Sequence, residues 1–272
     1  MSNWPVSSQV RTTVHPGGAT YNTTLTANAV TNTKGAWAEI TASSGDDAYG
    51  VVVQLFPSGS LSRYLIDLGI GAALSEIVVV ADMHWAVGRA VERYFKELYI
   101  PLYIPAATRI AGRCQANVTL DTCNIQIQLL KPGMIPGPMF GRATTYGAAA
   151  ADSGGTPVDC GATANTKGTP AQLVASTTNA MKAMMVCIGN NANAVESTGN
   201  FLCDIMVGAA AAEVVLSADL HLRSDAAGDS KVPQYFFLYA DVPSGTRLSA
   251  RGASSITDAT DRLFDVVVIG FD

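Results

Sequence analysis

Charged residues are scarce in this sequence of 272 residues. Asp, Glu, Lys and Arg together make up 14% of it, whereas hydrophobic residues make up 48%. Disordered chains have the opposite balance, so the composition predicts a folded protein of one large or two ordinary domains. The formal net charge is −5 and the basic residues form no run, which is not the electrostatic pattern of a nucleic-acid-binding surface. We therefore expect no nucleic-acid partner.

The sequence also lacks a long uninterrupted hydrophobic run. Its most apolar stretch, residues 64–80, contains Asp67 and Glu76, and this makes it a poor membrane-spanning segment. The first residues have no apolar segment of the kind that a secretory signal peptide needs. We expect no membrane partner and a chain that folds in a cytoplasm.

Cysteines are few, odd in number and irregularly spaced. This pattern is neither a disulfide framework nor a zinc signature. We interpret them mostly as small buried residues of a chain made in a reducing compartment. A bridge between Cys114 and Cys123 across a hairpin stays open. The five cysteines are Cys114, Cys123, Cys160, Cys187 and Cys203.

Histidines are limited to three, and two of them stand in the same short pattern, Asp82-x-His84 and Asp219-x-His221. An aspartate and a histidine on one strand face are a candidate pair of metal ligands, but a closed site needs more ligands. The alternative is that each aspartate pairs with an arginine of a neighbouring strand, and we favour it. The third histidine is His15.

Motifs of nucleophilic catalysis, of phosphate binding and of dinucleotide binding are absent. Carboxylates for glycoside hydrolysis can come from any part of a β fold, so a depolymerase remains an alternative. The carboxylates that recur along the chain are more typical of a scaffold than of a single active site. These are Asp67, Glu76, Asp204 and Glu213. We expect no catalytic residue, no cofactor and no metal, and a protein that is not an enzyme.

What the sequence does contain is an internal duplication. Residues 104–113 read IPAATRIAGR and residues 242–251 read VPSGTRLSAR, with the proline, the threonine and both arginines identical. Three further motifs recur in the same order and at nearly constant spacing: NTKG at 32–35 and 165–168, DLGIG and DIMVG at 67–71 and 204–208, and ADMH and ADLH at 81–84 and 218–221. Motifs repeated in register predict two homologous domains.

The positions of the repeated motifs and the composition between them suggest the boundaries of the two repeats. We expect an extended N-terminal arm over residues 1–24, repeat one over 25–131 and repeat two over 161–272. The interval 132–160 is rich in Pro, Gly and small residues, so we expect it to be a linker without regular sheet.

Short runs with alternating polarity predict strands in both repeats, most clearly CNIQIQL at residues 123–129. The predicted strands are 49–55, 76–82, 98–104 and 108–115 in repeat one, and 181–188, 213–221, 236–242, 246–251 and 264–269 in repeat two. Such spacing is typical of β-sandwiches. We predict an all-β protein made of two tandem jelly-roll-like β-sandwich domains.

One segment departs from the strand pattern. Residues 85–98 have apolar positions at nearly helical spacing, while the matching residues 222–234 are polar and contain Gly228 and Pro233. We interpret this segment as an excursion between strands, part of which could equally be a short helix.

The repeated ten-residue stretch predicts a hairpin corner. Each copy has a proline after one strand and a pair of arginines on one face of the next strand, because side chains alternate with a period of two. We expect a charged outer face and an apolar inner face, and hence a structural role. The corner residues are Pro105, Thr108, Arg109 and Arg113, and Pro243, Thr246, Arg247 and Arg251.

Aromatic residues are also few, at 7%. Tyr99 and Tyr103 precede the first corner and could form a modest platform for a sugar ring. Packing in a core or an interface is the interpretation that we favour for them.

With these motifs, the chain resembles virion structural proteins of tailed bacteriophages, in which the corner reads IPAGTRIAAR. Both the corner and the turn D-x-G-x-G at Asp67–Gly71 carry the resemblance. The chain departs from the corner pattern at Ala107, Gly112, Val242, Ser244, Leu248 and Ser249.

This resemblance implies a non-enzymatic component of a phage particle, either a capsid decoration protein or a tail, collar or fibre-base protein. Its implied partners are copies of itself and other virion proteins, and its implied location is the virion, assembled in the bacterial cytoplasm. The alternative is a tandem carbohydrate-binding module that attaches to a host-surface glycan.

Overall fold

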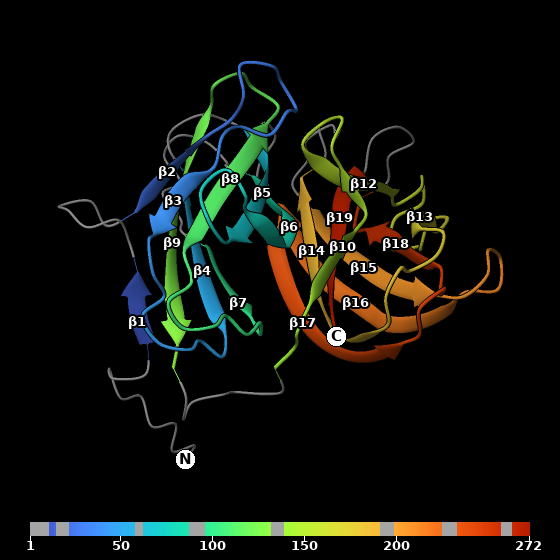
Figure 1. Cartoon of the computed structure of the whole chain (residues 1–272). Coiled ribbons are helices and arrows are strands. Elements are labelled where there is room, and N and C mark those ends of the chain that lie inside the picture. The colour runs from blue at the N-terminus through green and yellow to red at the C-terminus, as the bar shows by residue number, and fades with distance from the viewer. Residues whose placement is uncertain are drawn as a thin grey trace, which may run out of the picture.

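The computed structural model describes residues 11–14, 22–57, 62–86, 96–131, 139–190, 199–224, 233–256 and 263–272. The described residues form strands and turns without a helix, in two β domains that lie side by side (Figure 1). The predicted all-β fold with two tandem sandwich units is confirmed.

The first domain consists of two sheets packed face to face. Its strands are β1 (Arg11–Val14), β2 (Thr23–Thr26), β3 (Ala38–Thr41), β4 (Val51–Pro57), β5 (Arg63–Ile70), β6 (Ile77–Ala86), β7 (Lys96–Ile100), β8 (Ile110–Ala116) and β9 (Thr122–Leu130). One sheet has the order β1-β9-β4-β7, with β2 also on β9, and the other has the order β3-β8-β5-β6. The alternating β9 points Cys123, Ile125 and Ile127 into the core between them.

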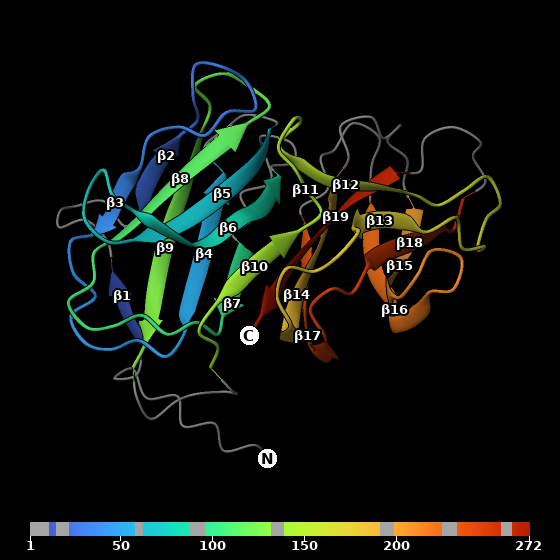
Figure 2. The same ribbon diagram turned by 45° about the vertical axis from the view of Figure 1, so that its right-hand side comes forward.

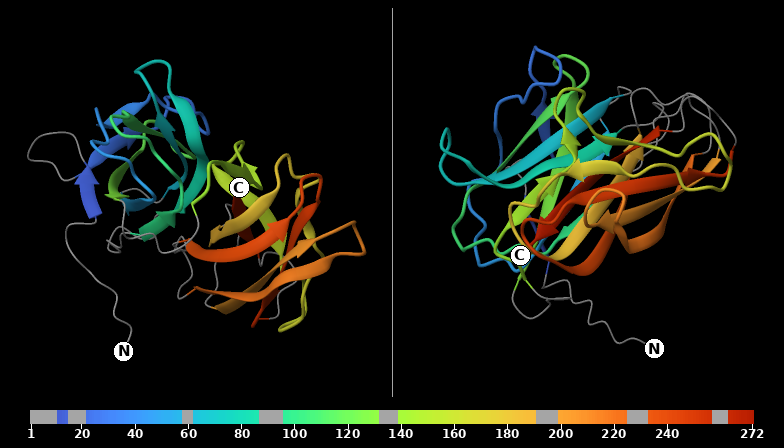
Figure 3. Two further views of the ribbon diagram at one scale, coloured as in Figure 1. Left: turned by 60° about the horizontal axis from the view of Figure 1, so that its bottom comes forward. Right: turned by 90° about the vertical axis from the view of Figure 1, so that its right-hand side faces the viewer.

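The second domain repeats this arrangement (Figure 3). Its strands are β10 (Ala143–Tyr146), β11 (Ala148–Ala149), β12 (Gly154–Asp159), β13 (Ala171–Val174), β14 (Met181–Asn190), β15 (Gly199–Val207), β16 (Val214–Ser224), β17 (Gln234–Val242), β18 (Leu248–Ser254) and β19 (Leu263–Phe271). One sheet has the order β11-β12-β19-β14-β17, with β10 also on β19, and the other has the order β13-β18-β15-β16. The strand orders of the two domains therefore match.

The segments expected to be an arm and a linker contain strands. Within 1–24, β1 pairs with β9, and within 132–160, β10 and β12 both pair with β19. The expectation that 132–160 holds no regular sheet was wrong, because its glycines allow close strand packing. A Cβ on Gly155 would lie 2.8 Å from the carbonyl oxygen of Val266.

The segment with helical spacing, 85–98, begins in β6 and ends in β7. Its middle, residues 87–95, lies outside the described residues, as does His15, so the helix remains a prediction. Gly69 lies in β5, and the turn after it begins at Gly71, whose φ is 109°.

The two domains are joined by an apolar contact. The core of the first domain continues into residues of β14 and β19, including Met185, Ile269 and Phe271. Neighbouring residues of the same two strands belong to the second domain's own core, so these side chains lie on the opposite face of the sheet. Strand β10 lies beside β6 (Figure 2). The Oγ1 of Thr145 donates a hydrogen bond to the carbonyl oxygen of Ala81 across this contact, at 2.6 Å.

Candidate functional site

The first repeated corner is closed by a hydroxyl group. Ser44 Oγ donates to the carbonyl oxygen of Pro105 at 2.8 Å and accepts the N–H of Thr108 at 3.1 Å. Ala107 lies at the tip with a φ of 56°, in the left-handed region that few residues other than glycine adopt. The corner is thus a hydrogen-bonded turn rather than a site with free polar groups.

The second corner has the same bonds. Thr177 Oγ1 donates to the carbonyl oxygen of Pro243 at 3.0 Å and accepts the N–H of Thr246 at 3.1 Å. Gly245 replaces the alanine at the tip, with a φ of 81°. The repeated motifs identified in the sequence did not include Ser44 and Thr177. The short motifs ASS at 42–44 and AST at 175–177 nevertheless recur at the spacing of the other repeats.

Arg109 binds the hairpin that joins β5 to β6. Its Nη1 donates to Glu76 Oε1 at 2.9 Å and to the carbonyl oxygen of Gly71 at 3.2 Å, and its Nε donates to Glu39 Oε2 at 2.7 Å. Burial raises the pKa of Glu76, but backbone N–H groups and the guanidinium outweigh burial and lower that pKa overall. The carboxylate is held inward, with 2% of its side chain exposed.

Arg247 occupies the same place in the second domain. Its Nη1 lies 2.6 Å from Glu213 Oε1 and 3.5 Å from the carbonyl oxygen of Gly208, and Gln172 accepts its Nε at 3.0 Å. Backbone N–H groups and the guanidinium lower the pKa of Glu213. Each arginine therefore fixes one hairpin and neutralises its glutamate.

The second arginine of each corner pairs with a buried aspartate on the adjacent strand. Arg113 Nε donates to Asp67 Oδ2 at 2.8 Å, and the two residues are direct partners in the ladder of β8 and β5. The other oxygen, Asp67 Oδ1, accepts Lys34 Nζ at 2.6 Å and the N–H of Asp82 at 2.9 Å. Lys34 also donates to Asp82 Oδ1 at 2.7 Å.

The same four-residue network recurs in the second domain. Asp204 accepts Arg251 Nε at 2.9 Å, Lys167 Nζ at 2.6 Å and the N–H of Asp219 at 3.0 Å. Lys167 also pairs with Asp219 at 2.9 Å. Burial raises the pKa of Asp204, but its hydrogen-bond donors hold that pKa below the ordinary value.

These networks correct the partner that we predicted for two aspartates. Asp82 and Asp219 pair with Lys34 and Lys167 of the repeated NTKG motif, and not with arginines. Each aspartate has a positive φ, 53° and 56°, and stands at an irregularity in the strand pairing. This local backbone turn directs the carboxylate to the lysine. In the described residues, no three His, Cys, Asp or Glu side chains are placed to hold a metal ion.

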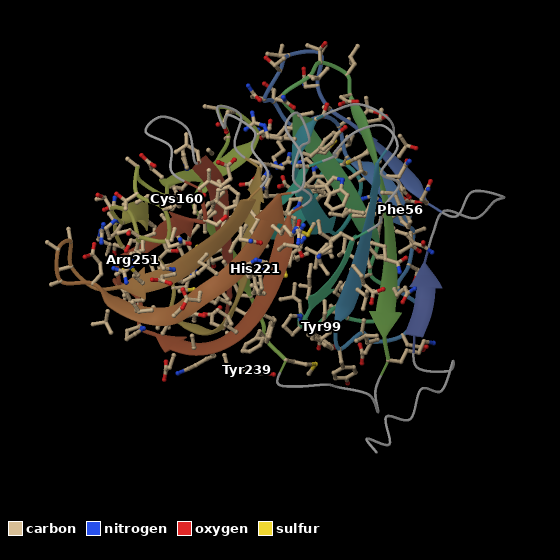
Figure 4. The ribbon with its side chains drawn as sticks, turned by 180° about the vertical axis from the view of Figure 1, so that it is seen from behind. Phe56, Tyr99, Cys160, His221, Tyr239 and Arg251 are labelled. Atoms are coloured by element: carbon tan, nitrogen blue, oxygen red, sulfur yellow. The ribbon has the colours of Figure 1, made fainter. Side chains whose placement is uncertain are left out.

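The histidines of the two Asp-x-His motifs have opposite environments. His84 is fully buried where β6 meets the second domain, with Cys187 Sγ 3.9 Å from its Nδ1 and the Tyr235 hydroxyl donating to its carbonyl oxygen. Burial, together with the charge of Arg63, lowers the pKa of His84 to about 3. His221 is exposed in the second domain (Figure 4). Its Nε2 lies 3.2 Å from Asn200 Oδ1.

All five cysteines are buried and none forms a disulfide, so Cys114 and Cys123 are not bridged. Both lie in the core of the first domain. The contact with the Cys114 thiol and burial raise the pKa of Cys123, and burial raises that of Cys187 and Cys203. Their neutral thiols act as small apolar groups, as predicted.

Each domain exposes apolar residues at the start of one edge strand. Ile77 is 68% exposed and Val78 follows it in β6, while Val214 is 67% exposed and Val215 follows it in β16. Leu74 lies in the hairpin before β6 and is also exposed. These positions correspond in the duplication, so the two domains present the same apolar edge.

A groove of about 340 Å³ lies beside Trp37 in the first domain, between the segments that flank β2 and β3. The Arg113 guanidinium stacks on the indole at 4.5 Å, and Gly69 leaves room for the ring, since a Cβ there would lie 2.6 Å from it. Pro170 and Met206 stand at the matching positions of the second domain. The indole and the glycine that makes room for it are therefore particular to the first domain.

The structure does not bring Tyr99 and Tyr103 together as a platform. Tyr99 packs toward Phe237 of the second domain, with ring centroids 6.5 Å apart. Tyr103 packs edge-on against Tyr49 and donates to Asp47 at 3.0 Å. Figure 4 shows Tyr99 on the side of its domain that faces Tyr239.

Comparisons with known proteins give little to set beside this geometry. No family model and no curated protein matches the chain. A solved structure of a protein named PNGF-II is similar with a TM-score of 0.41 and 10% sequence identity, over 97% of this chain. The chain spans 66% of the length of that protein. The described residues include no helix long and apolar enough to span a membrane.

Proposed function

We propose that this protein is a non-enzymatic structural component of a bacteriophage particle that acts through homo-oligomeric assembly. It would serve as a capsid decoration protein or as a tail, collar or fibre-base protein, in contact with copies of itself and with other virion proteins. The proposal locates it in the virion, after assembly in the bacterial cytoplasm.

The observation that carries this proposal is the apolar edge that both domains expose at the same position. Exposed apolar patches on a folded domain commonly mark interaction surfaces. The charged residues nearest to this edge support the same proposal, because Glu76 and Glu213 are engaged inside the corner by Arg109 and Arg247. A surface kept apolar and neutral in both repeats suits contact with another protein.

The test is assembly on particles. Purified protein should form a homo-oligomer by light scattering and should bind phage particles that lack it. A protein that stays monomeric at high concentration and does not bind such particles would refute the proposal.

A second candidate function, binding of a host-surface glycan, is favoured by the groove at Trp37. An indole held in place on one face is a suitable surface for a sugar ring. We expect Trp37→Ala to abolish glycan-array binding, while the Tyr99→Ala/Tyr103→Ala double variant should retain it. An array that is silent for the wild-type protein would remove this candidate.

A further inference from the structure

The edge strands β6 and β16 each have one side without a strand partner. Among the described residues, β6 pairs only with β5, and β16 pairs only with β15. The start of each strand carries no charge: residues 77–81 read IVVVA and residues 214–218 read VVLSA. Unpaired backbone groups beside β-branched side chains are a template for pairing with another strand.

We propose that β6 pairs edge to edge with β6 of a second copy of this chain, and that β16 pairs in the same way with β16 of another copy. Each chain then carries two self-association surfaces, which is the number needed to build a ring or an open chain of copies rather than a dimer. This inference rests on the proposed homo-oligomeric function and assigns the surface that performs it.

The duplication points to a second copy as the occupant. An antiparallel edge is complementary to itself under two-fold symmetry, so a copy of the chain supplies a fitting partner without any new surface. Both edges begin with two β-branched apolar residues, and the exposed fractions nearly coincide at Ile77 and Val214.

Charge also favours approach of a copy. The chain has a net charge of −5, which opposes self-association in general. At the two edges this repulsion is reduced, because the nearest carboxylates are paired: Glu76 with Arg109 and Glu213 with Arg247.

The length of the pairing surface is limited in both domains. The ladder of β6 with β5 shifts register between Val78 and Val80, and that of β16 with β15 shifts between Val215 and Ser217. Asp82 and Asp219 then have positive φ values, so the edge ends just before them. In the first domain, β10 also covers the edge at Ala81. The predicted contact therefore consists of residues 77–80 and 214–217.

The experiment measures the molar mass of the full chain by size exclusion with light scattering over a range of concentrations. The variants are Ile77→Lys, Val214→Lys and their double variant. A lysine on an edge strand opposes edge pairing, because its ammonium group would be desolvated beside a like charge. Val30→Lys is the matched control, since Val30 is 63% exposed but does not lie on an edge strand.

We expect the wild type and Val30→Lys to form oligomers of the same mass. Each single edge variant should form at most a dimer, and the double variant should be a monomer of about 28.3 kDa. A double variant with the wild-type mass would overturn the edge pairing while the homo-oligomeric function stands. A wild type that is monomeric at every concentration would overturn both.

Hydrogen exchange of the wild-type chain gives a second test that needs no substitution. Protection of the amides in 77–80 and 214–217 should rise with concentration as the mass rises. A rise in mass with unchanged protection in both segments would overturn the proposal.

Discussion

Replacing the buried Asp204 by asparagine should destabilise the second domain strongly. Its carboxylate, 3% exposed, accepts hydrogen bonds from Lys167, from Arg251 and from a backbone N–H. The isosteric Asp204→Asn keeps the volume but removes the charge that compensates two cations. Breaking a buried ion pair costs about 3–5 kcal/mol of the free energy of unfolding.

We expect the loss in the free energy of unfolding for Asp204→Asn to lie at the lower end of this range. Lys167 keeps its second carboxylate, Asp219, at 2.9 Å, and the Arg251 side chain is 32% exposed and therefore partly hydrated. A loss of about 3 kcal/mol corresponds to a fall in Tm of about 6–12 °C for a domain of this size class. Thermal unfolding followed by circular dichroism measures it.

The matched control is Asp219→Asn, which removes the other carboxylate bound to Lys167. Its side chain is 62% exposed, so the loss should stay below about 1 kcal/mol. The pKa of Asp204 is lowered in the folded state, so its contribution is present above the ordinary carboxyl pKa and is lost as the pH falls through the folded value. The difference between wild type and Asp204→Asn should therefore be constant near neutrality and shrink below about pH 4. Equal Tm values for wild type and Asp204→Asn, or a larger loss in the control, would refute this reasoning.

Two further predictions concern the corner and the domain contact. Arg109→Ala and Arg247→Ala should each lower Tm, because each arginine holds a hairpin against its domain, and neither should abolish specific binding. An unchanged Tm together with failed assembly would place these arginines in an interface instead. Neutral His84 has a folded pKa of about 3, so its contribution is present above the ordinary histidine pKa and is lost as the pH falls from about 6.5 toward 3. His84→Gln should flatten the pH dependence of Tm between about pH 6.5 and 3. The control His221→Gln, at an exposed histidine, should keep the wild-type pH dependence. Identical profiles for all three proteins would contradict the explanation that burial lowers the pKa of His84.

The duplication and the alternation of side chains were sufficient to predict the all-β fold and ten of the nineteen strands in the described residues. Pairs such as Asp67 and Arg113 were not predicted. The alternation of side chains along a strand shows which residues share a face, but it does not show which strands lie next to each other in the sheet. Asp82 was assigned the wrong partner for a local reason. Its positive φ interrupts the alternation of side chains along β6 and turns the carboxylate toward Lys34. Strand β12 was missed because its glycines serve close backbone approach, which composition alone does not distinguish from a linker.

The histidines show what a duplication cannot predict. His84 and His221 stand in the same motif on matching strands, yet one is buried and the other is exposed. The difference arises from docking of the second domain on β6, where Cys187 and Tyr235 contact His84. That contact depends on side chains far apart in the sequence, and only one of the two repeats receives it.

The central claim is tested most directly by the number of copies of this protein in a phage particle. Quantitative mass spectrometry of purified virions, calibrated against the major capsid protein, measures it. The account predicts multiple copies per particle: hundreds for a decoration protein, and a few to a few dozen for a tail, collar or fibre-base protein. Absence from purified particles would contradict the structural role and favour the glycan-binding alternative.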